Sequence, residues 1–254
     1  MIDLSAKVAL VTGGSRGIGR ACALRLAEAG ADVIVNYITS RAAAEEVASH
    51  IQGLGRRAAV VKADVGEQED IVAMIDFVRD SFGALDILVS NAATGGFRPL
   101  LATNARHFEA AMNINARALM FLIQAAIPLL DRSAGRAKVI ALSSPGSRMA
   151  LPLYGLIGGT KAALESLVRH FALEIGGRGV NLNIVQAGLV ETDSFLRMPE
   201  RDRLLAHRRA KSMVGDRGLT ARDVADAVLY LASPLSDMVQ GQTLVVDGGS
   251  SIHS

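Results

Sequence analysis

The chain is poor in the residues on which cross-linked, metal-binding and nucleic-acid-binding proteins depend. Its 254 residues include one cysteine and no tryptophan, and its formal net charge is only +2. A single cysteine excludes an intrachain disulfide and a cysteine-based zinc site. Cys22 lies in an apolar helical pattern, where a buried packing role is expected. No basic stripe accompanies the small positive charge, so we expect neither nucleic acid nor a membrane surface as partner.

The sequence also lacks dividing and targeting features. It has no Pro/Ser-rich linker, low-complexity tract or long charge block. Its first 14 residues do not combine a basic segment with the apolar segment of a signal peptide, and no run approaches the ~18 apolar residues of a membrane span. We therefore expect one domain over residues 1–254, located in the cytoplasm.

What the sequence does contain is a regular alternation of short β-branched runs with longer helical patterns. Residues 20–29, 41–54 and 70–82 repeat apolar side chains at helical spacing. Near-continuous apolar strands between such helices predict an α/β protein with a doubly wound, seven-stranded parallel sheet flanked by helices. The expected strands are residues 7–12, 32–37, 58–63, 85–90, 137–143, 180–185 and 242–247. Ligands bind such sheets beyond the carboxyl ends of the strands.

A glycine-rich loop, TGGSRGIG at residues 12–19, follows the first strand and opens a helix. Free N–H groups at such a helix start favour a pyrophosphate. Gly13-x-Ser15-x-Gly17 also fits a hydrolase nucleophile elbow, but no upstream strand or His-Gly-Gly stretch provides its oxyanion hole. A P-loop is excluded because Arg20 and Ala21 replace the required Lys and Ser/Thr. The predicted dinucleotide-binding residues are Gly13, Ser15, Arg16, Gly17, Ile18 and Gly19.

The second expected strand favours NADPH over NADH. An NAD site usually has Asp or Glu at this strand end, to bind the ribose 2′-hydroxyl. Here the strand ends at Asn36, and no carboxylate follows until Glu45. Arg16 and Arg41 are instead expected to face a 2′-phosphate. Alternatively, Arg41 is a solvated residue at the start of a helix.

Several ordered motifs together resemble the short-chain dehydrogenase/reductase family. They are TGGSRGIG, ADV at 63–65, SNAA at 90–93, NARALMFLIQAAIP at 115–128, a serine before a Tyr…Lys pair, and GQTLVVDGG at 241–249. The resemblance covers essentially the whole length. It implies a Rossmann-type fold, a nicotinamide cofactor and, most often, a homotetramer.

The resemblance also implies roles for individual residues. Those expected along the cofactor are Asp64 and Val65 at the adenine, Asn91 and Ala92 at the ribose, and Gly188, Val190 and Thr192 at the carboxamide and pyrophosphate, with Ala187 in place of the usual proline. Asn115 is expected to order a proton-relay water. Lys161 is expected to bind the nicotinamide ribose and lower the tyrosine pKa. Asn91 and Asn115 could instead bridge backbone groups, and Thr192 could cap a helix.

The departure from the family lies in YGLIGGTK, residues 154–161. The usual tyrosine precedes the lysine by four positions, where this chain has Ile157; Tyr154 precedes Lys161 by seven. On a helix both spacings place the pair on nearly one face. The longer spacing moves the tyrosine ~4.5 Å along the axis.

This displacement favours a carbon–carbon double bond as the group reduced. In ketone reduction the hydride and the proton go to adjacent atoms. In reduction of an α,β-unsaturated thioester, charge develops on an oxygen two bonds farther from the hydride acceptor, and the donor must be aimed there. The spacing resembles the enoyl-acyl-carrier-protein reductase branch of the family, and SNAATGGFRPL, MNINARALMF and GQTLVVDGG look most like its type III, NADPH-dependent members. A related resemblance is to enoyl-CoA reductases that carry GGxK, as Gly158, Gly159 and Lys161 do here. Ser144 is expected to bond the thioester oxygen or orient Tyr154; a strand-end serine bonded only to backbone is the alternative.

Residues 191–218 are expected to form an irregular substrate lid. Apolar side chains there suit an acyl chain: Phe195, Leu196, Met198 and Met213. The densest basic cluster suits an acidic acyl carrier protein or the phosphates of coenzyme A, unless it is only a solvated helix face: Arg201, Arg203, Arg208, Arg209 and Lys211.

The leading hypothesis is therefore an NADPH-dependent enoyl-thioester reductase whose catalytic residues are Tyr154, Lys161, Ser144 and Asn115, with no metal. The alternative is a β-ketoacyl-thioester reductase in which Tyr154 reaches a ketone through a remodelled loop. A catalytically silent nucleotide-binding regulator is disfavoured because all four residues are retained. The sequence does not distinguish acyl carrier protein from coenzyme A.

Overall fold

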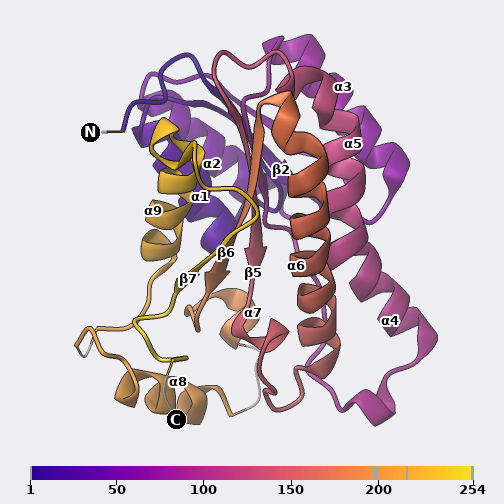
Figure 1. Cartoon of the computed structure of the whole chain (residues 1–254), viewed down its shortest axis with the longest axis vertical. Helices are drawn as coiled ribbons and strands as arrows, with labels where there is room; N and C mark the ends of the chain where they lie inside the picture. The colour runs from indigo at the N-terminus through magenta and orange to yellow at the C-terminus, as the bar shows by residue number, and fades with distance from the viewer. Residues whose placement is uncertain (1, 197–199, 216, 253–254) are drawn as a thin grey trace.

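The seven expected strands form one parallel sheet in the order β3-β2-β1-β4-β5-β6-β7 (Figure 1). The computed structural model describes residues 2–196, 200–215 and 217–252. The doubly wound, seven-stranded parallel sheet predicted from the sequence is confirmed, with each strand end within two residues of its expected position. The strands are β1 Val8–Val11, β2 Asp32–Tyr37, β3 Ala58–Lys62, β4 Ile87–Ser90, β5 Ala137–Ser143, β6 Val180–Ala187 and β7 Thr243–Val246.

Two layers of helices cover the sheet (Figure 1). Helices α1, α2 and α9 pack on one face around Leu26 and Val33, and α3, α5 and α6 pack on the other around Leu10 and Leu122. Apolar strands buried on both faces are what a parallel sheet requires. The helices are α1 Gly17–Glu28, α2 Arg41–Gly53, α3 Gln68–Phe82, α4 Ala105–Met112, α5 Ala118–Leu130, α6 Gly155–Ile175, α7 Asp193–Leu196, α8 Arg201–Ala210 and α9 Ala221–Ala232. Cys22, on α1, is fully buried, as predicted.

Helices α4 and α5 are continuous through a π-helical turn at Asn113–Arg117. The whole stretch, Ala105–Leu130, is long and apolar enough to cross a membrane by length and composition. The sequence alone did not single out this stretch, because Asn115, Arg117 and Gln124 interrupt its apolar runs. Half of its most apolar window is buried inside the protein, and Leu119 and Leu122 belong to the core beneath the sheet.

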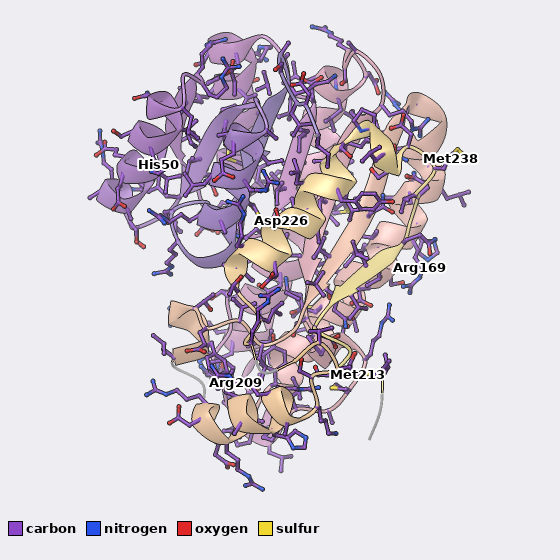
Figure 2. The ribbon with its side chains drawn as sticks, turned by 90° about the vertical axis from the view of Figure 1, so that its left-hand side faces the viewer. His50, Arg169, Arg209, Met213, Asp226 and Met238 are labelled. Carbon is purple, nitrogen blue, oxygen red and sulfur yellow. The ribbon has the colours of Figure 1, made fainter. Side chains whose placement is uncertain are left out.

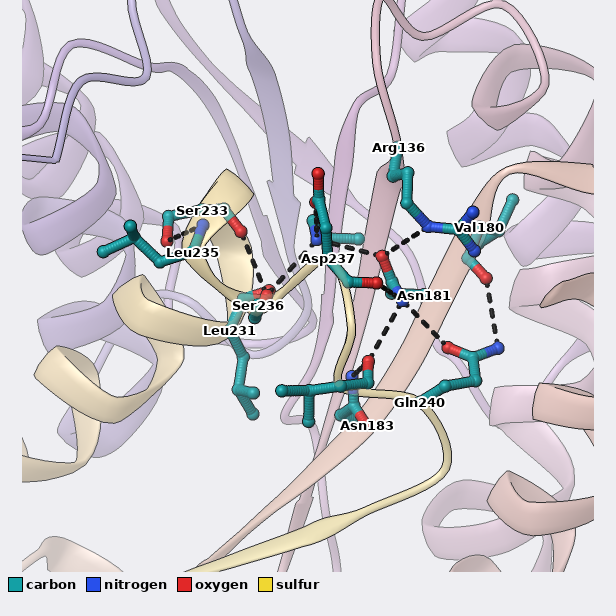
Figure 3. A network of polar contacts seen from close by, with 12 residues as sticks. Arg136, Val180, Asn181, Asn183, Leu231, Ser233, Leu235, Ser236, Asp237 and Gln240 are labelled. Carbon is teal, nitrogen blue, oxygen red and sulfur yellow. Dashed lines mark hydrogen bonds and ion pairs between the residues drawn. The ribbon is translucent and has the colours of Figure 1, made fainter.

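A polar network joins the amino-terminal ends of β5 and β6 to the segment that precedes β7 (Figure 3). The Lys138 ammonium donates to Asp237 Oδ1 at 2.6 Å and to Asn181 Oδ1 at 2.9 Å. The Asn181 amide group donates to the Val239 carbonyl at 3.0 Å and to Gln240 Oε1 at 3.2 Å. These bonds satisfy polar groups inside the protein, where an unpaired one would be costly, and fix β7 at the edge of the sheet.

The carboxyl ends of the strands face α7 and α8 (Figure 1). The expectation of an irregular chain over 191–218 is wrong for residues 193–196, which form α7, and for residues 201–210, which form α8. This helix carries only two leucines, Leu204 and Leu205, among charged residues, so it lacks the apolar periodicity by which a helix is recognised in a sequence.

Candidate functional site

A cleft of about 340 Å³ crosses the carboxyl ends of the central strands. Most of the residues predicted to bind the cofactor or act in catalysis line it: Gly13, Ser15, Arg16, Gly17, Ile18, Gly19, Asn91, Ala92, Ser144, Tyr154, Lys161, Gly188, Val190 and Thr192. Five predicted residues lie outside its lining: Asn36, Arg41, Asp64, Val65 and Asn115. The topology thus gathers side chains from segments more than 170 positions apart into one site.

The glycine loop at the start of α1 fits a dinucleotide pyrophosphate. A Cβ atom on Gly19 would lie 2.3 Å from the Gly13 carbonyl oxygen, so a larger residue would displace the loop. Arg16, the N-cap of α1, makes no side-chain capping bond. The first N–H groups of α1 therefore remain available to an anion at the positive end of the helix.

The two arginines expected at a 2′-phosphate have different surroundings. Arg41 lies outside the cleft, with 74% of its side chain exposed and its Nε 2.8 Å from Glu45 Oε1. Its contacts are those of a solvated residue at a helix start. Arg16 lines the cleft, and none of the residues described by the structure pairs with its guanidinium. Of these two arginines, Arg16 alone lines the cleft.

Asn36 is 2% exposed, and its side chain is hydrogen-bonded to the glycine loop beside it. Its Oδ1 accepts from the Gly13 N–H at 3.1 Å, and its Nδ2 donates to the Ala63 carbonyl at 3.0 Å. The residues that follow it do line the cleft, and the sequence reasoning missed them: Tyr37, Ile38, Thr39 and Ser40. Two adjacent hydroxyl side chains directly after the second strand were the available signal.

Several other predicted residues bridge backbone groups. Asn115, 3% exposed in the π-helical turn, accepts from the Thr94 N–H at 2.8 Å and donates to the Thr94 carbonyl at 2.7 Å and Thr160 Oγ1 at 3.0 Å. Asn91 donates to the carbonyls of Thr12 and Gly13 at 2.9 and 3.2 Å. For both residues, the bridging alternative describes the observed contacts. Asn91 also lines the cleft, whereas Asn115 does not.

Three further residues predicted to bind the cofactor make structural contacts within the protein: Asp64, Val65 and Thr192. Asp64 accepts from the Gly66 N–H at 2.8 Å, and Val65 is buried in the core. Thr192 Oγ1 accepts from the Phe195 N–H at 3.4 Å, as a helix cap would, while its side chain also lines the cleft.

Tyr154 lies immediately before α6 and directs its hydroxyl toward Ser144. Its carbonyl accepts the first bond of the helix, from the Gly158 N–H at 2.8 Å, so the helical spacing to Lys161 is kept. The Tyr154 hydroxyl donates to Ser144 Oγ at 3.0 Å. Burial raises the pKa of Tyr154 above its ordinary value, and the bond to Ser144 opposes this. The hydroxyl is therefore protonated at neutral pH.

Ile157 stands where the family has its tyrosine, and it does not reach the cleft. It is 8% exposed, and its side chain packs so closely on Gly95 that a Cβ there would lie 2.4 Å from Cγ1. Phe97, which the sequence reasoning also missed, lines the cleft beside Tyr154, with ring centroids 6.0 Å apart. Of the two positions that could carry the proton donor, 154 and 157, only Tyr154 lies in the cleft.

Lys161 is buried beneath the cleft, and its Nζ donates to the Leu142 carbonyl at 2.7 Å. Burial lowers the pKa of its ammonium to about 8, while the charge of Glu165 opposes this. Glu165, one turn farther along α6, is 4% exposed. It accepts from Ser143 Oγ and Ser147 Oγ, each at 2.6 Å, and so ties α6 to the loop that carries Ser144.

The apolar residues expected in the lid separate into two groups. Phe195 is buried and lines the cleft, whereas Leu196 and Met213 are more than half exposed; Met198 lies outside the described residues. Figure 2 shows Met213 at the end of the molecule where α8 lies.

The basic cluster is partly neutralised by neighbouring groups. Arg203 pairs with Glu200 at 3.1 Å and Arg209 pairs with Glu191 at 2.9 Å (Figure 2 labels Arg209). Arg208 donates to the Ser250 carbonyl at 3.2 Å. The remaining two members, Arg201 and Lys211, also have contacts. Within the described residues, no group of His, Cys, Asp and Glu is arranged to hold a metal ion.

Known proteins resemble this chain over almost its whole length. A family model described as enoyl-(acyl carrier protein) reductase matches residues 13–251. The 1-cyclohexenylcarbonyl-CoA reductase of Streptomyces collinus is 37% identical over 252 residues, covering 97% of this chain and 87% of that protein. The hydroxynaphthalene reductase-like protein Arp2 of Metarhizium majus is 36% identical over 263 residues, covering 98% and 96%.

Solved structures give the same result. A short chain dehydrogenase from Burkholderia cenocepacia J2315 in complex with NADP superposes with a TM-score of 0.88 and 34% identity, covering 97% of this chain and 98% of that one. A dehydrogenase/reductase from Sinorhizobium meliloti 1021 gives a TM-score of 0.88 and 34% identity, covering 98% and 96%.

Proposed function

Because this chain belongs to the short-chain dehydrogenase/reductase family, we propose that it is an NADPH-dependent reductase of α,β-unsaturated acyl thioesters. The observation that carries the proposal is the place of the tyrosine. Tyr154, seven positions before Lys161, lies in the cleft with its hydroxyl on Ser144. The four-residue position is filled by Ile157, which cannot donate a proton and lies outside the cleft lining.

The residues of the cleft suit NADPH. Bound NADPH would supply the hydride. The loop Gly13–Gly19 and the start of α1 would bind its pyrophosphate, and Arg16, with Thr39 and Ser40 beside it in the lining, would bind the 2′-phosphate. Lys161 would bind the nicotinamide ribose. Support for NADPH rather than NADH comes from the unpaired Arg16 and from the NADP in the Burkholderia cenocepacia relative.

Tyr154 would act at the oxygen of the thioester. Hydride addition at the β-carbon places negative charge on that oxygen, and a donor aimed there stabilises the charge. The Tyr154 hydroxyl is protonated in the free protein because burial raises its pKa. Ser144, at 3.0 Å, fixes the direction of the hydroxyl, and the ammonium of Lys161 would ease loss of its proton. Asn115 would act only indirectly, through the backbone of Thr94.

We propose coenzyme A rather than an acyl carrier protein as the carrier. The relative from Streptomyces collinus is a CoA-ester reductase. In addition, Glu200 and Glu191 neutralise two members of the basic cluster, which weakens the attraction of that surface for an acidic protein. Residues 191–218 would form the lid over the acyl group, with Phe195 as its buried wall.

A homotetramer in the cytoplasm is the accompanying proposal. Exposed apolar side chains beside α6 and the β7 edge support assembly: Leu173, Leu235, Met238, Leu244 and Val245. Apolar surface of this kind marks contacts between chains.

Reduction of a ketone is the second candidate. Ser144, Tyr154 and Lys161 share one cleft, as carbonyl reduction also requires, and the Metarhizium majus relative is named for hydroxynaphthalene reduction. The product would then be an alcohol rather than a saturated thioester.

The deciding experiment follows NADPH oxidation with crotonyl-CoA and acetoacetyl-CoA side by side. We expect turnover of crotonyl-CoA with at least about a hundredfold lower kcat/KM for acetoacetyl-CoA. Turnover of acetoacetyl-CoA alone would overturn the enoyl assignment in favour of the ketone.

Tyr154→Phe should lower kcat about a thousandfold or more with unchanged NADPH affinity.

A further inference from the structure

The ring of Tyr154 lies directly on the backbone of Gly146. Gly146 belongs to the 3-10 turn Pro145–Ser147, which follows Ser144 at the end of β5. A Cβ atom on Gly146 would lie 2.4 Å from Cδ1 and 2.5 Å from Cε1 of the Tyr154 ring, and real Cβ atoms essentially never approach below 3.0 Å. The observed position of the ring therefore requires that residue 146 has no side chain.

The ring has little freedom to move elsewhere. Its other neighbour in the cleft is Phe97, with the ring centroids 6.0 Å apart and tilted by 34°. The preceding residue, Leu153, has φ of +59°, a left-handed backbone that is rare for a branched side chain. Its carbonyl is held by the Arg98 N–H at 3.0 Å. A strained residue held by its surroundings is common where a side chain must be aimed.

The turn and the helix also approach each other through backbone alone. A Cβ on Gly158 would lie 2.4 Å from the Gly146 carbonyl oxygen. Glu165 holds the same turn from below, through its 2.6 Å bond to Ser147 Oγ. The turn that carries Gly146 is thus fixed against α6, so it cannot easily move away to make room for a side chain at residue 146.

We propose that Gly146 is a positioning residue for the reaction. The absence of a side chain at residue 146 determines where the Tyr154 ring lies, and so aims the Tyr154 hydroxyl at Ser144 and at the substrate oxygen. The inference rests on the proposed role of Tyr154 as proton donor. It does not depend on whether the substrate is an enoyl or a ketoacyl thioester.

The primary test compares Gly146→Ala with Gly159→Ala, using whichever thioester the protein reduces. The added methyl group at 146 should displace the ring and lower kcat about a hundredfold, since a misplacement of ~1 Å can cost that much. NADPH affinity should stay within about twofold, because Gly146 does not line the cofactor cleft. Gly159 is the matched control, since it lies on the exposed side of α6 and a Cβ there meets nothing within 4 Å; kcat should not change.

Two further measurements separate positioning from a general loss of structure. Phe97→Leu makes room on the other side of the ring, so Gly146→Ala should regain part of its lost kcat in that background. In a Tyr154→Phe background, Gly146→Ala should change the residual kcat by less than about twofold, because no hydroxyl remains to be misplaced. If Gly146→Ala alone does not fold, the comparison is made between Phe97→Leu and the double variant.

Tyrosine titration of the free protein gives a readout without cofactor. The hydrogen bond between Tyr154 and Ser144 lowers the pKa of Tyr154 against the effect of burial, so its loss in Gly146→Ala should move this ionisation to higher pH. The Tyr154→Phe spectrum identifies the signal. Retained kcat in folded Gly146→Ala, an unmoved titration, or an equal loss in the Tyr154→Phe background would each overturn the inference. Activity on acetoacetyl-CoA only would overturn the proposed function and leave this inference standing.

Discussion

Two lysines are buried at opposite ends of the sheet, and their surroundings differ. Lys138, near the amino end of β5, donates hydrogen bonds from its ammonium to Asp237, Asn181 and Ser236; Figure 3 labels these three partners. Lys161, on α6 at the carboxyl ends, has one bond, to the Leu142 carbonyl. Burial lowers the pKa of both ammonium groups. For Lys138 the nearby carboxylate of Asp237 opposes this directly, whereas Glu165 acts on Lys161 without a bond.

The difference separates a structural cation from one available to a ligand. An ammonium has three N–H donors, and three described side chains engage Lys138. Lys161 faces the cleft with donors left over. Desolvation without full compensation costs stability, and functional sites are where such costs are retained.

The largest effect is expected from Lys161→Met on catalysis. It removes the buried ammonium that lines the cleft and the proposed ribose ligand, so kcat/KM for the enoyl thioester should fall about a thousandfold or more. Lys138→Met should leave kcat/KM within about twofold, because Lys138 is remote from the cleft. Steady-state NADPH oxidation measures both. Equal losses in the two variants would abolish the distinction drawn between them.

The same Lys161→Met variant should not lose stability. The pKa of Lys161 falls from 10.5 to about 8 on folding, a difference worth about 3 kcal/mol. Below pH 8 the ammonium is charged in both states, so its burial costs stability there. Between about pH 8 and 10.5 the folded state binds fewer protons, and the cost disappears as pH rises. Urea unfolding should therefore show Lys161→Met more stable than wild type at pH 7, with the gap closing toward pH 10. A variant less stable at pH 7 would contradict this.

Lys138→Met should lower the free energy of unfolding by about 2 kcal/mol, the scale of hydrogen bonds to a charged group. The substitution leaves Asn181 and Asp237 without their donor. The half-exposed Asp237 can be hydrated, which limits the loss. Lys62→Met, at an exposed position of β3, is the matched control and should be near neutral in the same urea titration.

A smaller effect separates the two arginines at the cofactor end. Arg16→Ala should raise the Kd of NADPH about tenfold and leave that of NADH within about twofold, since only NADPH carries the 2′-phosphate. Arg41→Ala should change neither, because its partner is Glu45. Fluorescence titration with both cofactors measures this. If Arg41→Ala weakens NADPH binding more than Arg16→Ala does, the 2′-phosphate binds at the start of α2 instead.

The smallest effect is expected from Glu165→Gln. In wild type, kcat/KM should fall as pH rises through about 8, where Lys161 loses its proton. Glutamine keeps an acceptor for Ser143 and Ser147 but removes the charge that raises the pKa of Lys161. The fall should move to lower pH, with Glu174→Gln, exposed on the same helix, as control. An unmoved profile would mean that Glu165 acts only through its hydrogen bonds.

Much of the fold could be predicted because each strand carries its own signal. Runs such as DVIVNY at 32–37 are apolar and β-branched over their whole length, and β2 has these bounds. Helix α8 could not be predicted because its sequence, RDRLLAHRRA, buries no face of its own. The sequence left two roles open for Arg41, a phosphate ligand or a solvated helix start, and the structure pairs it with Glu45, four positions away on the same helix.

Local sequence accounts for the succession of strands and helices along the chain, the glycine loop at the first strand end and the spacing between Tyr154 and Lys161, because these depend on neighbouring residues. Folding of the whole chain determines which cations have partners, that Asn115 bonds to Thr94 and Thr160, and that Gly146 lies beneath the Tyr154 ring. Those outcomes depend on differences of a few tenths of an ångström in the distances between segments far apart in the chain. Only packing of the whole molecule sets such distances.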